Sequence, residues 1–152
     1  MKLCLMYHGV IYSKKNSKRI ITNHRTRRPM IVSSERAKAM EQNMASQFSA
    51  QFNEIYRNYY LHPQPVETCQ GKPLKVSVFI WEKDRTRRDL DNQATSILDA
   101  LVEAGVIADD SVKVVQELNV RMMGIDKFDP HALVEIEGVD DYEPITTNKR
   151  KD

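Results

Sequence analysis

Residues 74–81 alternate between two sets of side chains, and this alternation constrains the fold more than any other stretch of the chain. One set is Leu74, Val76, Val78 and Ile80, and the other is Lys75, Ser77, Phe79 and Trp81. A period of two is typical of a β-strand that buries one face. The segment therefore predicts a strand with one face in the core. We interpret Trp81 as a packing residue, with stacking on a nucleic-acid base as the alternative.

After this strand the period changes to that of a helix. The apolar residues now recur three and four positions apart, at Ala94, Ile97, Leu98, Leu101 and Val102. This spacing predicts a buried stripe on a helix that Asp91 caps and that continues to Ala104. Gly105 is the expected stop, because glycine readily adopts the left-handed conformation that ends many helices.

A longer helix is predicted between a short strand at 31–32 and about Tyr60, with Ser33 and Ser34 as its caps. Its apolar residues, again three and four positions apart, are Ala37, Met40, Met44, Phe48, Phe52, Ile55 and Tyr59. We interpret this stripe as core packing rather than as a pocket for a cofactor.

Further strands are predicted at Lys2–Tyr12, Val112–Met123 and Ala132–Glu137. The expected fold is an α+β domain with one mixed sheet of about four strands and two main helices packed on it. The length of 152 residues fits a single domain. We expect this domain to span residues 1–138, and the polar tail at 139–152 to be disordered.

The charge of the chain is unevenly distributed. The net charge is only +2, but residues 1–40 hold ten Lys and Arg against the single acid Glu35, which gives +9 there and −7 in the rest. We expect the basic segment at 13–28 to be a loop or hairpin that contacts nucleic-acid phosphates, with a solvated loop as the alternative. Its lysines are Lys14, Lys15 and Lys18.

Composition also narrows the cellular setting. No apolar run reaches the ~20 residues of a membrane helix, and the first residues show no clear signal-peptide cleavage site. Cys4 and Cys69 occur without a CxxC motif, which favours a reduced, cytoplasmic protein. The short apolar runs favour a protein without a membrane partner. The histidines, which show no metal-ligand spacing and are given no role, are His8, His24, His62 and His131.

Residues 85–110 carry the candidate chemistry. Asp89 and Asp91 stand two apart where the strand passes into the helix, so in an extended segment their carboxylates point to the same side. Like charges held close need a cation or a proton, and Mg²⁺ or Mn²⁺ favours carboxylate oxygens. Three arginines suited to phosphate precede them: Arg85, Arg87 and Arg88. Acids for metal beside arginines for phosphate indicate metal-assisted cleavage of a nucleic-acid backbone.

Each of these residues also has a structural interpretation. Asp89 and Asp91 are then a helix cap and a surface acid. We expect Asp110 to return to the same end of the helix after three to four turns and a short loop, and the alternative is a turn-forming acid. Asn92 is expected to position Asp91 or contact phosphate, or else only to start the helix. Asp99 is expected to support the site indirectly or to form a core hydrogen bond, rather than to bind metal.

Three motifs in this stretch carry a family resemblance. RDLDN at 88–92, LDAL at 98–101 and AGVIADD at 104–110 together resemble the RusA-type Holliday-junction resolvases, endodeoxyribonucleases that phages and prophages often carry. The resemblance implies a RusA-like fold and a homodimer that cuts four-way DNA junctions symmetrically with Mg²⁺ or Mn²⁺, in the bacterial or phage-infected cytoplasm near the nucleoid. Carried over by position, the acidic triad of the family falls on Asp89, Asp91 and Asp110.

Thr95 departs from the family pattern, in which a lysine stands one helical turn after the second aspartate. A lysine there balances charge near the scissile phosphate, and threonine cannot. Either another cation takes this role, with Lys83, Arg85 and Lys113 as candidates, or the protein cuts slowly or not at all. Two alternatives to a resolvase therefore stay open: a junction-binding protein without cleavage, and a metal nuclease that acts on flaps or RNA.

Overall fold

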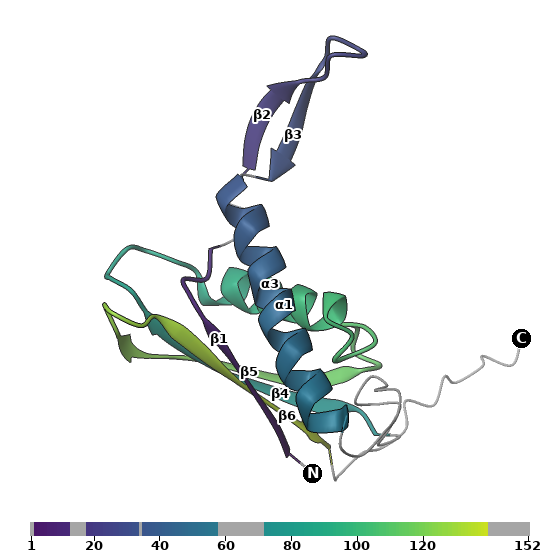
Figure 1. Ribbon diagram of the computed structural model, residues 1–152, viewed down its shortest axis with the longest axis vertical. Coiled ribbons are helices and arrows are strands. Elements are labelled where there is room, and N and C mark those ends of the chain that lie inside the picture. Colours follow the sequence, from purple (N-terminus) through teal and green to yellow (C-terminus); the bar gives the residue numbers. More distant parts are fainter. Residues whose placement is uncertain (1, 13–17, 34, 58–71, 140–152) are drawn as a thin grey trace, which may run out of the picture.

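The structure is a computed structural model that describes residues 2–12, 18–33, 35–57 and 72–139 (Figure 1). The elements in chain order are β1 (Lys2–His8), β2 (Lys18–Thr22), β3 (Pro29–Ser33), α1 (Glu35–Arg57), β4 (Leu74–Glu82), α3 (Leu90–Glu103), β5 (Val115–Ile125) and β6 (His131–Gly138). The predicted tail from residue 140 on, together with Lys14, Lys15 and Tyr59, lies outside the described residues.

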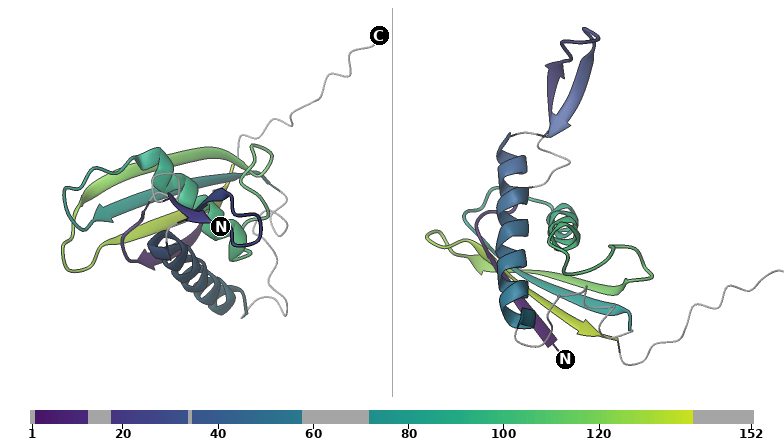
Figure 2. Two further views of the ribbon diagram at one scale, coloured as in Figure 1. Left: turned by 90° about the horizontal axis from the view of Figure 1, so that it is seen from above. Right: turned by 45° about the vertical axis from the view of Figure 1, so that its right-hand side comes forward.

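Four strands form one mixed sheet in the order β1-β6-β4-β5. β4 and β5 are parallel, whereas β1 and β4 each pair antiparallel with β6. Both helices lie on the same face of this sheet (Figure 2). β2 and β3 form a separate antiparallel hairpin that projects beyond the start of α1 (Figure 1). The basic segment predicted at 13–28 covers β2 and the turn of this hairpin, and β3 follows it. The predicted α+β class, with a mixed sheet and packed helices, is confirmed.

The strand register gathers the core on the helix-facing side of the sheet. One row across the sheet contains Leu5, Val134, Val78 and Val120. The first three of these side chains are at most 1% exposed. Burial of an aliphatic side chain of this size contributes about 1.5–3 kcal/mol. A slip of one residue would turn the whole row to the other face, so the alternation in β4 fixes its register.

The apolar stripe of α1 is confirmed from Ala37 to Phe52 and wrong near its end. The five predicted positions from Ala37 to Phe52 are buried, but Ile55 is 37% exposed and Tyr56 is 1% exposed instead. Tyr56 follows Phe52 by four residues, and that spacing keeps the two rings on one face, with centroids 4.6 Å apart.

α1 also covers the outer edge of β1. Gln51 accepts a hydrogen bond from the Met6 amide at 2.8 Å and donates to the Met6 carbonyl oxygen at 2.6 Å. Gln47 makes the same pair of bonds to His8, at 2.8 and 3.1 Å. These side chains satisfy backbone groups that an edge strand otherwise leaves open.

Three predicted boundaries shift in the structure. Asp89, rather than Asp91, is the N-cap of α3. β1 ends at His8, before Gly9 with its positive φ of 149°. β5 begins at Val115 rather than Val112, because the preceding residues close a turn through Ser111. Gly105 ends α3 as predicted, with φ 74°. Within the described residues, no helix is both long and apolar enough to cross a membrane.

Candidate functional site

A hollow of about 370 Å³ lies at the carboxyl ends of β4 and β5. Ten residues line it: Glu82, Asp84, Arg85, Thr86, Arg87, Arg88, Leu90, Gln93, Met122 and Ile125. The parallel pairing of β4 with β5 brings both strand ends to this edge, and the loop between β4 and α3 supplies the arginines. All three predicted arginines therefore gather at one hollow next to the start of α3.

Arg88 is tied into the protein by a partly buried ion-pair network. Its guanidinium lies 3.2 Å from a Glu82 carboxylate oxygen and 3.1 Å from an Asp84 oxygen, and its side chain is only 13% exposed. Gln93 donates to the other Glu82 oxygen at 2.5 Å. Hydrogen bonds from Thr86, together with Arg88, hold the pKa of Asp84 below its usual range. Arg88 thus positions the loop, whereas Arg85 and Arg87 are exposed.

Asp89 and Asp91 stand at the amino end of α3, and both are exposed. Asp89 occupies the N-cap position, but its side chain makes no capping hydrogen bond. Asn92 instead donates to an Asp89 carboxylate oxygen at 3.4 Å. From the sequence we expect Asn92 to position Asp91, but its contact is with Asp89. Because Asp91 lies in the first turn of the helix, the extended geometry predicted for the pair is wrong. The dipole of the helix still favours negative charge, and therefore bound anions, at this end.

Thr95 and Asp99 follow along α3. The Thr95 hydroxyl donates to the Asp91 carbonyl oxygen at 3.0 Å, so it is bonded to the helix backbone one turn before it. Asp99 is half-buried and lies eight positions after Asp91, about 12 Å further along the axis at the usual rise per residue. At that separation it does not support a cation bound at the start of the helix.

Asp110 lies at the opposite end of α3 from Asp89 and Asp91, and the expectation that it returns to their end is wrong for a single chain. It follows the C-cap Ala104 and precedes the turn from Ser111 to Val115 that leads into β5. Figure 1 shows the loops before and after α3 at opposite ends of the sheet. Hydrogen bonds from Ser111 and from the Asp110 amide lower the pKa of the neighbouring Asp109, which is therefore engaged in the turn.

A group that could hold a metal ion was missed in the sequence. Within the described residues, Asp126, Asp129 and His131 are the three acids or histidines whose ligand atoms lie within 4.8 Å of one another. His8 extends this group, because its Nδ1 lies 3.0 Å from an Asp129 oxygen. Mixed imidazole and carboxylate ligands suit Mn²⁺ or Zn²⁺ better than Mg²⁺. The spacing DxxDxH was the available signal in the sequence, but His8 joins only through the pairing of β1 with β6.

This second group lies on the sheet face away from the helices. His131 stacks on Trp81, with ring centroids 4.4 Å apart and planes 14° apart. Trp81 follows Ile80, which is 2% exposed on the helix-facing side, so alternation places the Trp81 ring on the other face. Trp81 thus packs on His131, in line with the packing interpretation, and the group lies on the face opposite the helices.

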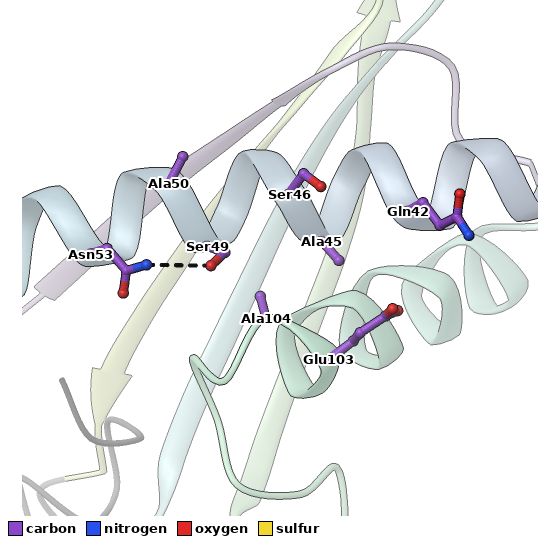
Figure 3. A pocket seen from close by; sticks show the side chains of 8 residues that line it. All are labelled: Gln42, Ala45, Ser46, Ser49, Ala50, Asn53, Glu103 and Ala104. Carbon is purple, nitrogen blue, oxygen red and sulfur yellow. Dashed lines mark hydrogen bonds between the residues drawn. The ribbon is translucent and has the colours of Figure 1, made fainter. Parts of the chain in front are cut away.

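A larger hollow, of about 680 Å³, lies between α1 and the end of α3 (Figure 3). Small and amide side chains of α1 line it, opposite Ala104 and Glu103. Glu103 is the single carboxylate among its lining residues, and no lining residue is basic. This surface therefore offers no set of ligands for a metal or a phosphate.

The β2–β3 hairpin carries exposed cations that the predicted DNA-binding set did not include. Arg25, Arg27 and Arg28 lie in its exposed tip. Asn23 closes this tip by accepting hydrogen bonds from the Arg25 amide at its side-chain oxygen and from the Arg27 amide at its carbonyl oxygen. Arg27 adopts φ 55°, in the left-handed region that tight turns require. The signal was the excess of cations in this part of the chain. Lys18 begins β2.

An α+β domain with exposed acids at a helix start, beside an arginine-lined hollow and a basic hairpin, is equipped to act on nucleic acid. The family model described as Endodeoxyribonuclease RusA matches residues 21–137, more than half of the chain. The chain therefore belongs to the RusA family of endodeoxyribonucleases, and the resemblance found in its motifs is confirmed. A search of curated proteins found no match.

Proposed function

We propose that this protein is a metal-dependent endodeoxyribonuclease that resolves four-way DNA junctions by paired, symmetric cleavage as a homodimer. The family match over residues 21–137 is the observation that carries this proposal. The exposed pair Asp89 and Asp91, next to the arginine-lined hollow, supports it on chemical grounds. Two-fold symmetry in the protein suits two equivalent cuts in a junction. The proposed setting is the cytoplasm of a bacterium or a phage-infected host, where such junctions form.

The proposed catalytic and metal-binding residues are Asp89, Asp91 and Asp110. Carboxylates of this kind would hold Mg²⁺, which Mn²⁺ can replace, and the metal would supply an activated water and stabilise charge on the phosphate. Asn92 holds the Asp89 carboxylate toward the start of α3 at 3.4 Å. The amino end of α3 adds its positive dipole at the same place. Arg88, held by Glu82 and Asp84, keeps the loop that carries these acids in position.

DNA contacts are proposed for two basic surfaces. Arg85 and Arg87 are exposed at the hollow beside the acids. The hairpin tip presents three more arginines at a distance from the sheet (Figure 1). Lys14, Lys15 and Lys18 belong to the basic segment around β2 and are proposed to contact the phosphate backbone with the hairpin. Such contacts supply affinity that falls steeply as salt rises.

The test is nicking of a labelled four-way junction in Mg²⁺ or Mn²⁺ and in chelator, beside the variant Asp91→Asn. Paired symmetric nicks that require both metal and Asp91 are expected. Asp91 is exposed, so its change to Asn leaves the fold intact and acts on chemistry. A junction that is bound tightly but never cut would overturn the nuclease in favour of a junction-binding protein, the alternative that Thr95 favours. Preferential cutting of flaps or RNA of equal length would overturn the proposal that the four-way junction is the substrate.

A further inference from the structure

One row across the sheet carries three rings on the face away from the helices. His131 of β6 stands opposite His8 of β1 on one side and opposite Trp81 of β4 on the other. Residues directly opposite each other in antiparallel strands share a face and lie close together. The two imidazole rings have centroids 6.1 Å apart, and the Trp81 indole stacks on His131 at 4.4 Å. The strand register alone therefore brings two histidines together.

The turn between β5 and β6 adds two carboxylates to this pair of histidines. Its first residue, Asp126, donates its amide to the Glu82 carbonyl oxygen at 2.7 Å, and the Gly9 amide donates to the Pro130 carbonyl oxygen at 2.8 Å. The turn is thus anchored to the ends of both β4 and β1. Within it, the Asp129 amide donates to one carboxylate oxygen of Asp126 at 3.1 Å. That bond fixes the Asp126 carboxylate and leaves its second oxygen free of the turn.

The nitrogens of the histidines face the oxygens of this turn. His8 Nδ1 lies 3.0 Å from an Asp129 carboxylate oxygen. His131 Nδ1 lies 2.6 Å from the Asp129 carbonyl oxygen and 3.8 Å from the second Asp126 oxygen. Such oxygens only accept, so each contact requires a proton, or a cation in its place, between oxygen and nitrogen. Within the described part of the chain, both carboxylates pair with histidines and neither pairs with Lys or Arg.

The separations fit the coordination of a single small ion. The ligand atoms of Asp126, Asp129 and His131 lie within 4.8 Å of one another. Ligands at about 2.0–2.2 Å from Zn²⁺ stand at most about 4.4 Å apart, so small side-chain movements suffice. His131 is only 17% exposed and is held by Trp81, whereas Asp129 and His8 are 56% and 55% exposed and can adjust. Imidazole nitrogen favours Zn²⁺ and related transition metals over Mg²⁺, which prefers oxygen alone.

We propose that His8, Asp126, Asp129 and His131 bind one divalent transition-metal ion of the Zn²⁺ type. The bound ion joins the end of β1 to the β5–β6 turn and to β6, so its role is to stabilise this end of the sheet. It lies on the face opposite the helices, away from the acids at the start of α3. The site is therefore independent of the proposed nuclease, and its test does not use DNA cleavage.

Trp81 is the single tryptophan of the chain, so its fluorescence reports on this site directly. Co²⁺ takes the same kinds of ligand as Zn²⁺ and, as an open-shell ion, quenches the fluorescence of a nearby indole. Titration of the full chain with Co²⁺ is expected to quench Trp81 and to saturate at one ion per chain. Equimolar Zn²⁺ is expected to restore the fluorescence, and a large excess of Mg²⁺ is not. Absence of saturable quenching, or its reversal by Mg²⁺, would overturn the proposal.

Substitutions that leave the indole and its stacking partner in place identify the ligands. His8→Asn and Asp129→Asn are each expected to weaken Co²⁺ binding at least about tenfold. The matched controls are His24→Asn, which removes an exposed imidazole from the hairpin, and Asp91→Asn, which removes an exposed acid from α3. Both controls are expected to bind Co²⁺ as the wild type does. Wild-type quenching in His8→Asn and Asp129→Asn, or its loss in Asp91→Asn, contradicts the assignment.

Thermal unfolding with and without Zn²⁺ gives a second measurement that does not depend on Trp81. An ion that binds only the folded chain raises the midpoint of unfolding. Zn²⁺ is expected to raise the midpoint of the wild type and of Asp91→Asn, and not that of Asp126→Asn. In chelator, Asp126→Asn is expected to unfold near the wild-type midpoint, because asparagine keeps the oxygen that accepts from the Asp129 amide. An equal rise with Zn²⁺ in Asp126→Asn would show that the ion binds elsewhere, and the proposed site would be wrong.

Discussion

The two edges of the sheet are treated in opposite ways. At β1, Gln47 and Gln51 of α1 bind the outward backbone groups, and apolar residues such as Leu5 are 1% exposed. At β5, Leu118 and Met122 on the same face remain about two-fifths exposed. One edge is closed within the chain, and the other stays open in the single chain. We therefore expect the proposed homodimer to form at β5 rather than at β1.

The same contrast extends to the acids of α3. α3 connects β4 to the open edge strand β5, with Asp89 and Asp91 at one end and Asp110 at the other. The three proposed catalytic acids therefore lie on the side of the sheet that ends in the open edge.

Opening the β1 edge is expected to have the largest effect. Gln47→Leu together with Gln51→Leu removes four hydrogen bonds to β1, which is expected to cost about 2–4 kcal/mol in the free energy of unfolding. Urea denaturation measures this loss. Gln42→Leu on the same helix is the control, because Gln42 is exposed and faces the hollow beside α3. Unfolding at the wild-type urea midpoint would show that α1 does not close this edge.

Reversing a charge on the β5 edge is expected to weaken the dimer and not the fold. In an antiparallel pair of two β5 strands with Asn119 opposite Asn119, each Glu117 stands opposite Arg121 of the other copy. If the proposed homodimer pairs in this register, Arg121→Glu sets two pairs of like charges opposite each other, and this is expected to weaken dimerisation about 30-fold, or about 2 kcal/mol. Sedimentation equilibrium measures the dissociation constant, and urea denaturation of the diluted monomer is expected to be unchanged. Lys127→Glu makes the same charge change in the exposed turn after β5. Equal weakening by both variants would point to overall charge rather than to the register centred on Asn119.

Thr95 stands where the family pattern has a lysine, so another cation is expected to balance charge at the proposed site. Of the candidate replacements, Lys83 lies in the loop after β4, whereas Lys113 is exposed in the turn beside Asp110. Lys113 follows Asp110, one of the proposed catalytic acids, by three residues. Lys113→Ala is therefore expected to lower the single-turnover nicking rate about tenfold while junction binding is kept.

Lys83→Ala is the control for that change, because it removes the same charge from the exposed loop that precedes Asp89. A large loss from Lys83→Ala with none from Lys113→Ala would place the compensating cation in the loop after β4 instead.

Local patterns predicted the elements well, because each depends on neighbours in sequence. The alternation in β4 and the stripe of α3 required only their own periods, and Gly105 required only its left-handed φ of 74°. Near the end of α1 the period was ambiguous between Ile55 and Tyr56, and packing against Phe52 decided it. Boundaries such as the start of β5 depended on a turn through Ser111 that periodicity does not report.

The site was harder to predict, because it depends on the three-dimensional path of the backbone between the motifs. The motifs led to the proposal of Asp89, Asp91 and Asp110 as site residues, but they did not report the ends of α3 that these residues occupy. That placement follows from the parallel pairing of β4 with β5, which requires α3 to run the length of the sheet. The group of His8, Asp129 and His131 was hidden for a similar reason, since pairing of β1 with β6 brings together residues 121 positions apart.

A smaller effect is expected from the apolar side of the β5 edge. Leu118→Asn removes a side chain that is 42% exposed in the single chain and that meets Val120 of the partner in the proposed pair. Loss of this remaining burial is expected to weaken the dimer about fivefold, or about 1 kcal/mol, with little change in monomer unfolding. Ile20→Asn on the hairpin, where Ile20 is 74% exposed, is the control for apolar loss away from β5. If Leu118→Asn leaves the dissociation constant unchanged while Arg121→Glu raises it, the two strands interact through their charged face alone. The helix-facing side chains of β5 then do not contribute to the dimer.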